Sequence, residues 1–191
     1  MNHALDIIKD IAAYMDVELP VFGNVYPHLV QIQDGDGKVY PAQFNQGEYS
    51  QILSFGDGNT LYFRLDPVAD ISETERRVSS CADTFTERHR GRMVGIWRNT
   101  GYDDRSYDIL TLAKLKLAEY APTVAVAPIS RMRVVLTGQN LGKWDVWREE
   151  FRNIDYSLHS NHVMFVVNFD LIFEYDRTDC IESLIPCCDG I

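Results

Sequence analysis

The feature that most constrains the fold is a strict alternation of side chains near the end of the chain. Residues 163–175 read VMFVVNFDLIFEY, with an apolar or aromatic side chain at every odd-numbered position. Successive side chains of a β-strand point to opposite faces of its sheet, so this pattern predicts one long strand with one face on the core. The even-numbered positions become polar toward the end, and Asn168, Asp170 and Glu174 are therefore expected to lie on a wet face or at a contact.

Two segments carry the helical period instead. Residues 3–16 and residues 105–120 each place apolar side chains on one stripe, and Pro122 ends the second segment. Asn2 is the expected N-cap of the first helix. The expected inward side chains are Leu5, Ile8, Ile11, Ala12 and Met15 in the first segment and Ile109, Leu110, Leu112, Ala113, Leu117 and Tyr120 in the second.

Shorter segments predict further strands. Residues 34–37 are an Asp-Gly turn that predicts a hairpin between its flanking segments. The alternation in 60–66 points Tyr62 and Arg64 outward. The predicted strands are 25–33, 39–44, 60–66, 79–98 as one long strand or a pair bent near Gly91, 123–127 and 131–137. The charged segment 71–78 predicts a short helix, and 140–153 predicts a helical turn or a loop.

The order helix, strands, helix, strands predicts an α+β fold. The expected architecture is an antiparallel sheet with two main helices packed on one face. No change in composition indicates a second domain, so residues 1–178 are expected to form a single domain and residues 179–191 a C-terminal tail. No run of about 18 apolar residues is present, so no membrane span is expected.

The charge of the chain is segregated along the sequence. The formal net charge is −10. Residues 1–75 hold 3 basic and 12 acidic side chains, residues 76–143 hold 12 and 6, and residues 144–191 hold 3 and 10. These net charges of −9, +6 and −7 can give complementary surfaces that attract another subunit. The alternative is that the fold interleaves the three segments and averages their charges.

Motifs for metal or phosphate chemistry are incomplete. The loop from Asp34 begins like a calcium loop, but Lys38, Val39 and Asn45 occupy its fifth, sixth and twelfth positions. Residues 138–144 lack the glycine spacing of a phosphate-binding loop and the Ser or Thr that follows its Lys. An ordinary loop that binds no phosphate is therefore expected there. We therefore expect no metal and no cofactor.

Histidine and cysteine positions give no catalytic arrangement either. His159 and His162 are close in sequence, but no third zinc ligand is indicated, and His28 and His89 are far away. Cys81 stands alone. The other cysteines are Cys180, Cys187 and Cys188. They are expected to be free thiols, although a disulfide between Cys180 and Cys187 is left as an alternative. No hydrolase elbow or distinctive carboxylate pair is present, so no catalytic residue is assigned.

A basic stretch leaves three interpretations open. Its cationic side chains are Arg76, Arg77, Arg88, His89, Arg90, Arg92 and Arg98. They could meet nucleic-acid phosphates, with Phe85 and Trp97 available to stack on bases. They could instead contact an acidic protein surface, or form a solvated face. The net charge of −10 argues against general nucleic-acid binding.

The order of elements resembles a viral family. The segments LDIIKDIAAYM, VYPHLVQIQDGDGKVYPAQF, GRMVGIWRN, SYDILTLAKLKLAEY and VMFVVNFDLIFEY follow one another as in the tail-terminator, tail-completion and neck-ring proteins of tailed bacteriophages. The resemblance implies a non-enzymatic structural protein, without cofactor, that forms a homo-oligomeric ring of six or twelve copies in the virion after assembly in the host cytoplasm. It also implies other tail, portal or connector proteins as partners, and DNA passage through the lumen without specific binding.

Two hypotheses therefore stand at this stage. In the ring hypothesis, the interface residues are expected among Arg88, Arg90, Arg92, Asn168, Asp170 and Glu174. In the alternative hypothesis, the chain is a small soluble enzyme or ligand-binding domain with an unrecognised site. The alternative predicts a pocket with convergent polar groups.

Overall fold

The chain has the α+β fold that the order of its segments predicts. The computed structural model describes residues 3–45, 47–51, 58–66, 69–76, 83–98, 106–122, 129–155 and 162–176. The helices are α1 (His3–Glu18), α2 (Ser106–Glu119) and α3 (Lys143–Glu150). The strands are β1 (Asn24–Tyr26), β2 (Val30–Gln33), β3 (Val39–Asn45), β4 (Glu48–Gln51), β5 (Thr60–Leu65), β6 (Asp70–Arg76), β7 (Asp83–Arg98), β8 (Ile129–Asn140) and β9 (His162–Asp176).

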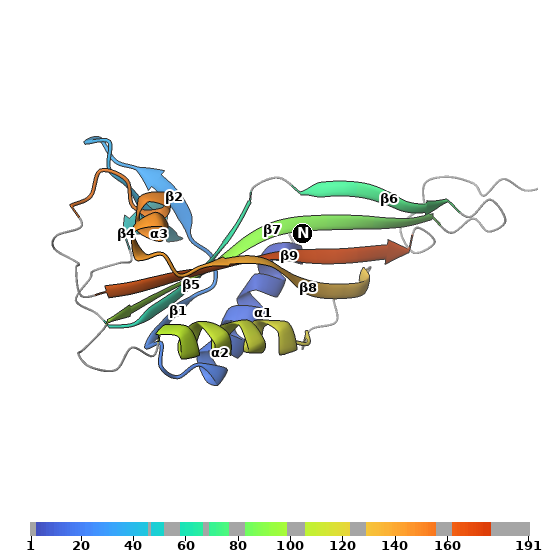
Figure 1. Ribbon diagram of the computed structural model, residues 1–191. Helices are drawn as coiled ribbons and strands as arrows, with labels where there is room; N and C mark the ends of the chain where they lie inside the picture. The colour runs from blue at the N-terminus through green and yellow to red at the C-terminus, as the bar shows by residue number, and fades with distance from the viewer. Residues whose placement is uncertain are drawn as a thin grey trace, which may run out of the picture.

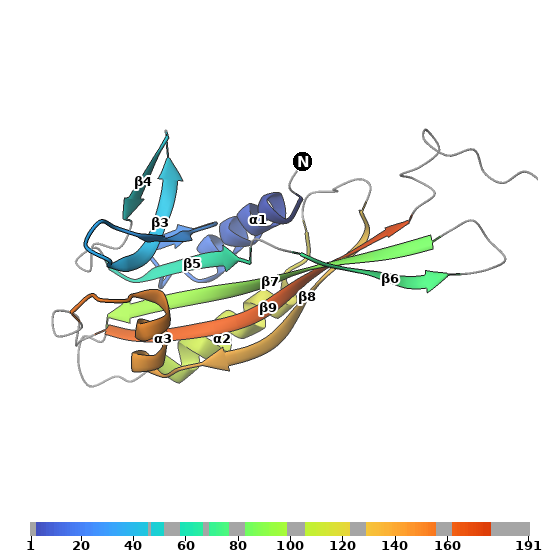
Figure 2. The ribbon, with the colours of Figure 1, turned by 90° about the horizontal axis from the view of Figure 1, so that it is seen from above.

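Strands β7 and β9 form the centre of the main sheet. They pair antiparallel over their whole shared length, from Thr84 opposite Asp176 to Arg98 opposite His162. The strand order is β1-β5-β7-β9-β8, and β6 pairs with the half of β7 that β5 does not reach. Figures 1 and 2 show β6, β7 and β9 extending together beyond the helices as a long arm. A second, three-stranded sheet has the order β2-β3-β4.

The first core lies between the main sheet and the helices α1 and α2. The odd-numbered side chains of β9 from Phe165 to Phe173 are buried there, together with Leu61, Phe63 and Met93. Ala4, Ile7 and Ile8 begin the buried stripe of α1. The helices are also joined directly, because the Tyr120 hydroxyl donates to Asp10 at 2.5 Å and Lys116 pairs with Glu18 at 2.7 Å. The long alternation therefore does form the inner face of the core.

Two glycines of β7 make room for aromatic rings of this core. A Cβ placed on Gly91 would lie 2.5 Å from the ring of Phe169, and one on Gly95 would overlap the ring of Phe165. Both glycines lie opposite those phenylalanines in the register of β7 and β9. The strand nevertheless runs without a break from Asp83 to Arg98, so Gly91 marks a close approach and not a bend.

The second core lies on the opposite face of the same sheet. Helix α3 and the residue after it contribute Val146, Trp147 and Phe151. They pack on Tyr62 and on the even-numbered side chains Val94, Ile96, Met164 and Val166. The three-stranded sheet adds Tyr40 at the margin of this core. The first half of β9 is therefore buried on both faces, which explains its continuous apolar composition.

Several sequence-based expectations are wrong in detail. Residues 70–76 form strand β6 and not a helix, because their backbone pairs with β7. The expected strand 25–33 is two strands: β1 pairs parallel with β5, and β2 begins the hairpin after Pro27. Tyr62, expected to point outward, is fully buried, and Leu112, expected to be buried, is 42% exposed.

The remaining expectations on local structure have mixed outcomes. Residues 143–150 form a helix, which confirms the helical reading of 140–153. Gly138 and Asn140 belong to β8, so the expected loop at 138–144 is limited to two residues. Asn2, the strand 123–127 and the tail 179–191 lie outside the described residues. Among the described residues, no helix is long and apolar enough to cross a membrane.

Candidate functional site

The six residues predicted at an interface lie together on one face of the main sheet. In the register of β7 and β9, Arg90 faces Asp170 and Arg92 faces Asn168. Arg88 is the next position of this alternation on β7, and Glu174 lies two positions of the alternation beyond Asp170 on β9, opposite Thr86. The fold thus gathers two sequence segments about 80 residues apart, as Arg88 and Asp170 show. Helix α3 covers only the neighbouring part of this face (Figure 2).

The expectation of a wet surface is wrong at Asp170. Asp170 is only 3% exposed. Its carboxylate accepts a hydrogen bond from Arg88 Nε at 2.8 Å and another from the same guanidinium. Glu174 is half-buried, 3.9 Å from Arg133. The Oδ1 atom of Asn168 is buried and has no hydrogen-bond partner among the described residues. A carboxylate taken out of water needs a cation beside it, and Arg88 provides one.

The segregated charges meet inside the chain. Arg88 and Arg92 of the basic middle segment pair with Asp170 and Glu149 of the acidic last segment. Lys116 of the middle segment pairs with Glu18 of the acidic first segment, and this contact raises the pKa of Lys116. The fold therefore interleaves the three segments at these positions. These cations are consequently engaged within the chain, which favours the averaging interpretation over two separate charged surfaces.

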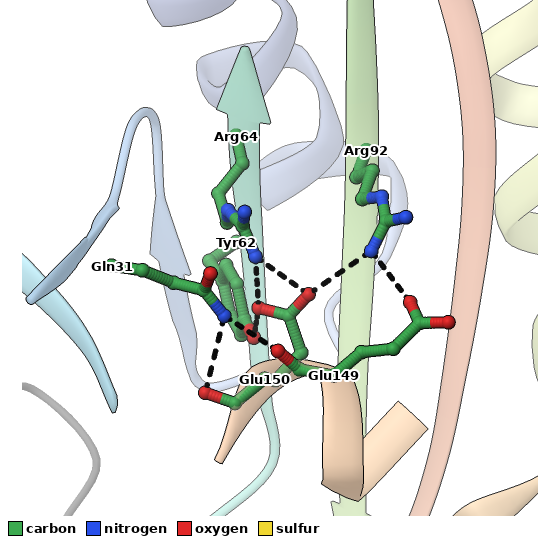
Figure 3. Close-up of polar contacts among 6 residues, drawn as sticks. All are labelled: Gln31, Tyr62, Arg64, Arg92, Glu149 and Glu150. Carbon is green, nitrogen blue, oxygen red and sulfur yellow. Dashed lines mark hydrogen bonds and ion pairs between the residues drawn. The ribbon is translucent and has the colours of Figure 1, made fainter. Parts of the chain in front are cut away.

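Glu150 is the centre of the most extensive buried polar cluster that the structure describes (Figure 3). Its side chain is 0% exposed, although it is an acidic residue on a short surface helix. The Arg64 guanidinium donates to both of its carboxylate oxygens at 2.7 Å, and the Tyr62 hydroxyl donates to one of them at 2.9 Å. Arg92 lies 3.6 Å away and donates to neighbouring Glu149 at 2.6 Å. Two carboxylates and two guanidiniums thus neutralise one another.

The tyrosine in this cluster is held in its neutral form. Burial raises the pKa of the Tyr62 hydroxyl well above its ordinary value, and the negative charge of Glu150 and its hydrogen bond raise it further. The hydroxyl therefore serves as a hydrogen-bond donor to the carboxylate throughout the physiological pH range. Sequence reasoning missed Glu150 because the run Glu149-Glu150 resembles an ordinary charged helix end.

The same helix end attaches the three-stranded sheet. The Gln31 side chain of β2 donates to the backbone carbonyl of Glu149 at 2.7 Å, which satisfies one of the free carbonyls at the end of α3. Backbone hydrogen bonds join Val39 and Arg152 in both directions, at 2.9 and 3.0 Å. Asn153, at φ 60°, donates to the carbonyl of Gly37 at 2.8 Å. We infer that the Glu150 cluster is a structural anchor for this sheet.

Two clefts lie beside these clusters. One, of about 360 Å³, is bounded by α1, β2, β5 and β7 and has His28, Arg64, Asp66 and His89 among its lining residues. The Nδ1 atom of His28 has no hydrogen-bond partner among the described residues, and burial, with a smaller effect of Arg64, lowers the pKa of His28. The other, of about 260 Å³, lies over Arg90, Arg92, Asn168 and Asp170.

The positions examined for metal chemistry have other roles. Asp34 closes the hairpin turn: its Oδ1 accepts hydrogen bonds from the backbone N–H groups of Asp36 and Lys38, both at 2.9 Å. This confirms the hairpin interpretation of that loop. His162 is 5% exposed at the start of β9, and His159 lies outside the described residues. Within the described residues, no group of three or more metal-ligating side chains comes together.

Exposed apolar side chains gather at two places. Phe44 and Tyr49 face each other across β3 and β4, with ring centroids 4.9 Å apart, and are 60% and 54% exposed. We call them the hairpin patch. Tyr107, Leu112 and Leu115 on the outer side of α2 are 69%, 42% and 53% exposed. We call them the helix patch. Clusters of large exposed apolar side chains are typical of interaction surfaces.

Comparisons with known proteins add no relative. No protein-family model matches the chain, and no curated protein matches it either.

Proposed function

We propose that this chain is a non-enzymatic structural protein of a tailed bacteriophage that forms a homo-oligomeric ring. The ring would sit at the head–tail junction or at the tail end, as in tail-terminator and connector proteins. Its partners would be six or twelve copies of itself and neighbouring tail or portal proteins. Support for the viral assignment is the order of elements described above, a helix, a hairpin, a long strand, a helix and a closing strand.

The observation that carries the self-assembly part is the position of the two apolar patches. In Figure 1 the three-stranded sheet, which bears the hairpin patch, lies above the main sheet, and α2, which bears the helix patch, lies below it. Each patch would remain wet in a monomer. Two different apolar surfaces on opposite sides of one subunit suit a heterologous contact, and such contacts close into rings when the rotation between neighbours permits.

Strand addition along β8 is a poorer route to assembly. β8 ends the strand order of the main sheet, and no other described strand pairs with its outer edge. However, β8 contains two register shifts, between Ile129 and Arg131 and between Leu136 and Gly138. Bulges and charged residues such as Arg131 and Arg133 are devices that protect edge strands from pairing. Side-chain patches therefore suit the subunit contact better than this edge does.

The mass of the purified protein in solution tests the proposal. One chain has a mass of 21.9 kDa, so six copies give about 131 kDa and twelve give about 263 kDa. Size-exclusion chromatography with light scattering should show one of these species, and negative-stain electron microscopy should show closed rings. A chain that remains monomeric at high concentration, both alone and with tail or portal proteins of the same virus, would contradict the proposal. Portal, capsid and tape-measure genes beside its gene would support it.

The larger cleft favours one alternative, a small enzyme or ligand-binding domain. His28, Arg64 and His89 line this cleft, and the Nδ1 atom of His28 has no hydrogen-bond partner in the part of the chain that the structure describes. Several polar groups around one cleft are typical of ligand sites. A screen of small polar metabolites by thermal shift would detect such a ligand. The alternative requires that the stabilisation disappear in a His28→Ala variant that still folds.

A further inference from the structure

Four aliphatic side chains line the larger cleft. They are Leu5 of α1, Leu29 just before β2, Val30 of β2 and Leu65 at the end of β5. Leu29 is held in place, because it is 1% exposed and its backbone N–H donates to the Phe63 carbonyl at 2.8 Å. The cleft volume of about 360 Å³ lies in the range of sites that bind small molecules. The cleft therefore has room for a small ligand with an aliphatic part.

Arg64 brings positive charge to this cleft. Glu150 uses only its Nη1 atom, and the Nε and Nη2 atoms of Arg64 make no hydrogen bond with another described residue (Figure 3). A guanidinium carries five N–H donors in a planar fork, so Arg64 keeps donors for a second carboxylate. Burial, and further the charge of Arg64, lower the pKa of His28, which also lines the cleft. A positive potential therefore reaches the cleft although Arg64 is paired with Glu150.

Asp66 brings negative charge to the same cleft. Its backbone N–H donates to the Arg90 carbonyl at 2.9 Å, so the chain continues along β7 for one residue beyond β5. Residues two apart in an extended chain share a face and lie about 6.8 Å apart, so Arg64 and Asp66 are neighbours on one face. Asp66 is exposed, and its carboxylate has no hydrogen bond or ion pair within the part of the chain that the structure describes. The cleft thus contains a cation and a carboxylate that do not pair with each other.

His89 adds an imidazole whose orientation is fixed. Its Nε2 atom lies 2.7 Å from Oε1 of Glu87, and Oε2 of the same carboxylate accepts from the Tyr175 hydroxyl at 2.5 Å. The ring also packs edge-on against Phe173, with centroids 5.7 Å apart. A carboxylate only accepts hydrogen bonds, so Nε2 of His89 carries the proton and Nδ1 of the neutral ring is an acceptor. No described residue donates to this Nδ1 atom, so it is free for a donor on a ligand in the cleft that His89 lines.

We infer that the cleft binds a free α-amino acid with an aliphatic side chain. Arg64 donates to the carboxylate of the ligand, Asp66 and His89 Nδ1 accept from its ammonium group, and its side chain packs on the aliphatic residues of the lining. A ligand with a carboxylate alone would add a second negative charge beside Asp66, and an amine alone would add a second positive charge beside Arg64. The inference goes beyond the proposed ring and does not depend on it, because the cleft lies within one subunit.

A series of matched ligands tests the recognition of both charges. Leucine is titrated into the full chain by calorimetry, beside isocaproate, which lacks the ammonium group, isoamylamine, which lacks the carboxylate, and glycine, which lacks the aliphatic part. Leucine should bind with a Kd below about 1 mM, and each of the other three should bind at least about 10-fold more weakly. Absence of leucine binding would overturn the site. Equal binding of leucine and any one of the other three would overturn the recognition of the group that this ligand lacks.

A single substitution then locates the ammonium group. Asp66→Asn should weaken leucine binding about 10-fold, because the ammonium group loses its carboxylate partner, while isocaproate should bind as well as before or more tightly. Asp66 is exposed, so the variant should fold, and circular dichroism checks this. Asp36→Asn is the matched control, since its carboxylate is 78% exposed in the hairpin turn and does not line the cleft. Unchanged leucine binding in Asp66→Asn, or an equal loss in Asp36→Asn, would overturn the placement of the ligand.

Light scattering on the same samples separates this inference from the proposed ring. A monomeric parent protein that binds leucine would contradict the ring and leave the ligand site standing. A ring that binds no leucine would overturn the ligand site and leave the ring standing.

Discussion

Arg64 of β5 and Glu150 of α3 form a buried ion pair in which one guanidinium nitrogen donates to both carboxylate oxygens at 2.7 Å. The two residues are 86 positions apart in the sequence. The pair connects the main sheet to the helix end that holds the three-stranded sheet through Gln31. It therefore governs how the hairpin patch is positioned relative to the rest of the subunit.

Removal of the Glu150 carboxylate should destabilise the fold strongly. In Glu150→Ala the Tyr62 hydroxyl and the Arg64 guanidinium lose their acceptor, and the free energy of unfolding should fall by about 3 kcal/mol. Urea denaturation measures this loss. The matched control is Glu149→Ala, whose carboxylate is 49% exposed beside Arg92, and its loss should stay below about 1 kcal/mol. Equal losses in the two variants would show that the cluster is no anchor.

A methyl group at Gly95 should disturb the first core. Its carbon would overlap the Phe165 ring, and overpacking of this kind costs about 1–3 kcal/mol of unfolding free energy. Gly35→Ala is the control, because nothing lies within 4 Å of a Cβ at that position. Thermal unfolding should show a lower Tm only for Gly95→Ala. The double variant Gly95→Ala with Phe165→Leu should recover part of the loss, and absence of recovery would count against this explanation.

Removal of the Arg88 side chain should destabilise the fold, because Asp170 then loses the cation that compensates its buried charge. The Asp170 residue is 3% exposed, while the Arg88 side chain is 45% exposed, so solvent screens part of the pair. Arg88→Ala should lower the free energy of unfolding by about 1–2 kcal/mol. Arg133→Ala, 3.9 Å from Glu174 and 53% exposed, should change it by less than about 0.5 kcal/mol. Chemical denaturation of the two variants under the same conditions distinguishes these outcomes.

His28 should make stability depend on pH. Burial, and to a smaller extent Arg64, lower its folded-state pKa below the ordinary 6.5, so the unfolded chain binds more protons than the folded chain below that pH. The contribution of neutral His28 is complete above pH 6.5 and decreases as the pH falls toward the folded-state pKa, by at most about 1.4 kcal/mol per pH unit. Urea unfolding at about pH 7.5 and about pH 5.5 should show a larger loss for the parent than for His28→Gln. An identical loss in both proteins would refute the role of His28.

The sequence by itself determined the elements that have a strong local period. The alternation of 163–175 predicted β9 and its buried face, and the helical stripes of 3–16 and 105–120 predicted α1 and α2. These predictions succeeded because the period of the side chains is a property of neighbouring residues, and one face of each element must reach a core. The hairpin around Asp34 was predictable for a similar reason, since its turn chemistry is local.

Only the tertiary structure decided what depends on distant partners. Residues 70–76 are charged and locally suit a helix, but β7 offers a free edge to their backbone, so they form β6. Tyr62 lies on the face of β5 away from the first core, but α3 covers that face with a second core, and the Tyr62 hydroxyl donates a hydrogen bond to Glu150. The charge pattern left open whether the charges form separate surfaces or average out, and the fold pairs Arg88 with Asp170 across adjacent strands. Long-range pairing and burial set these outcomes, and no local pattern in the sequence encodes which distant residue will be the partner.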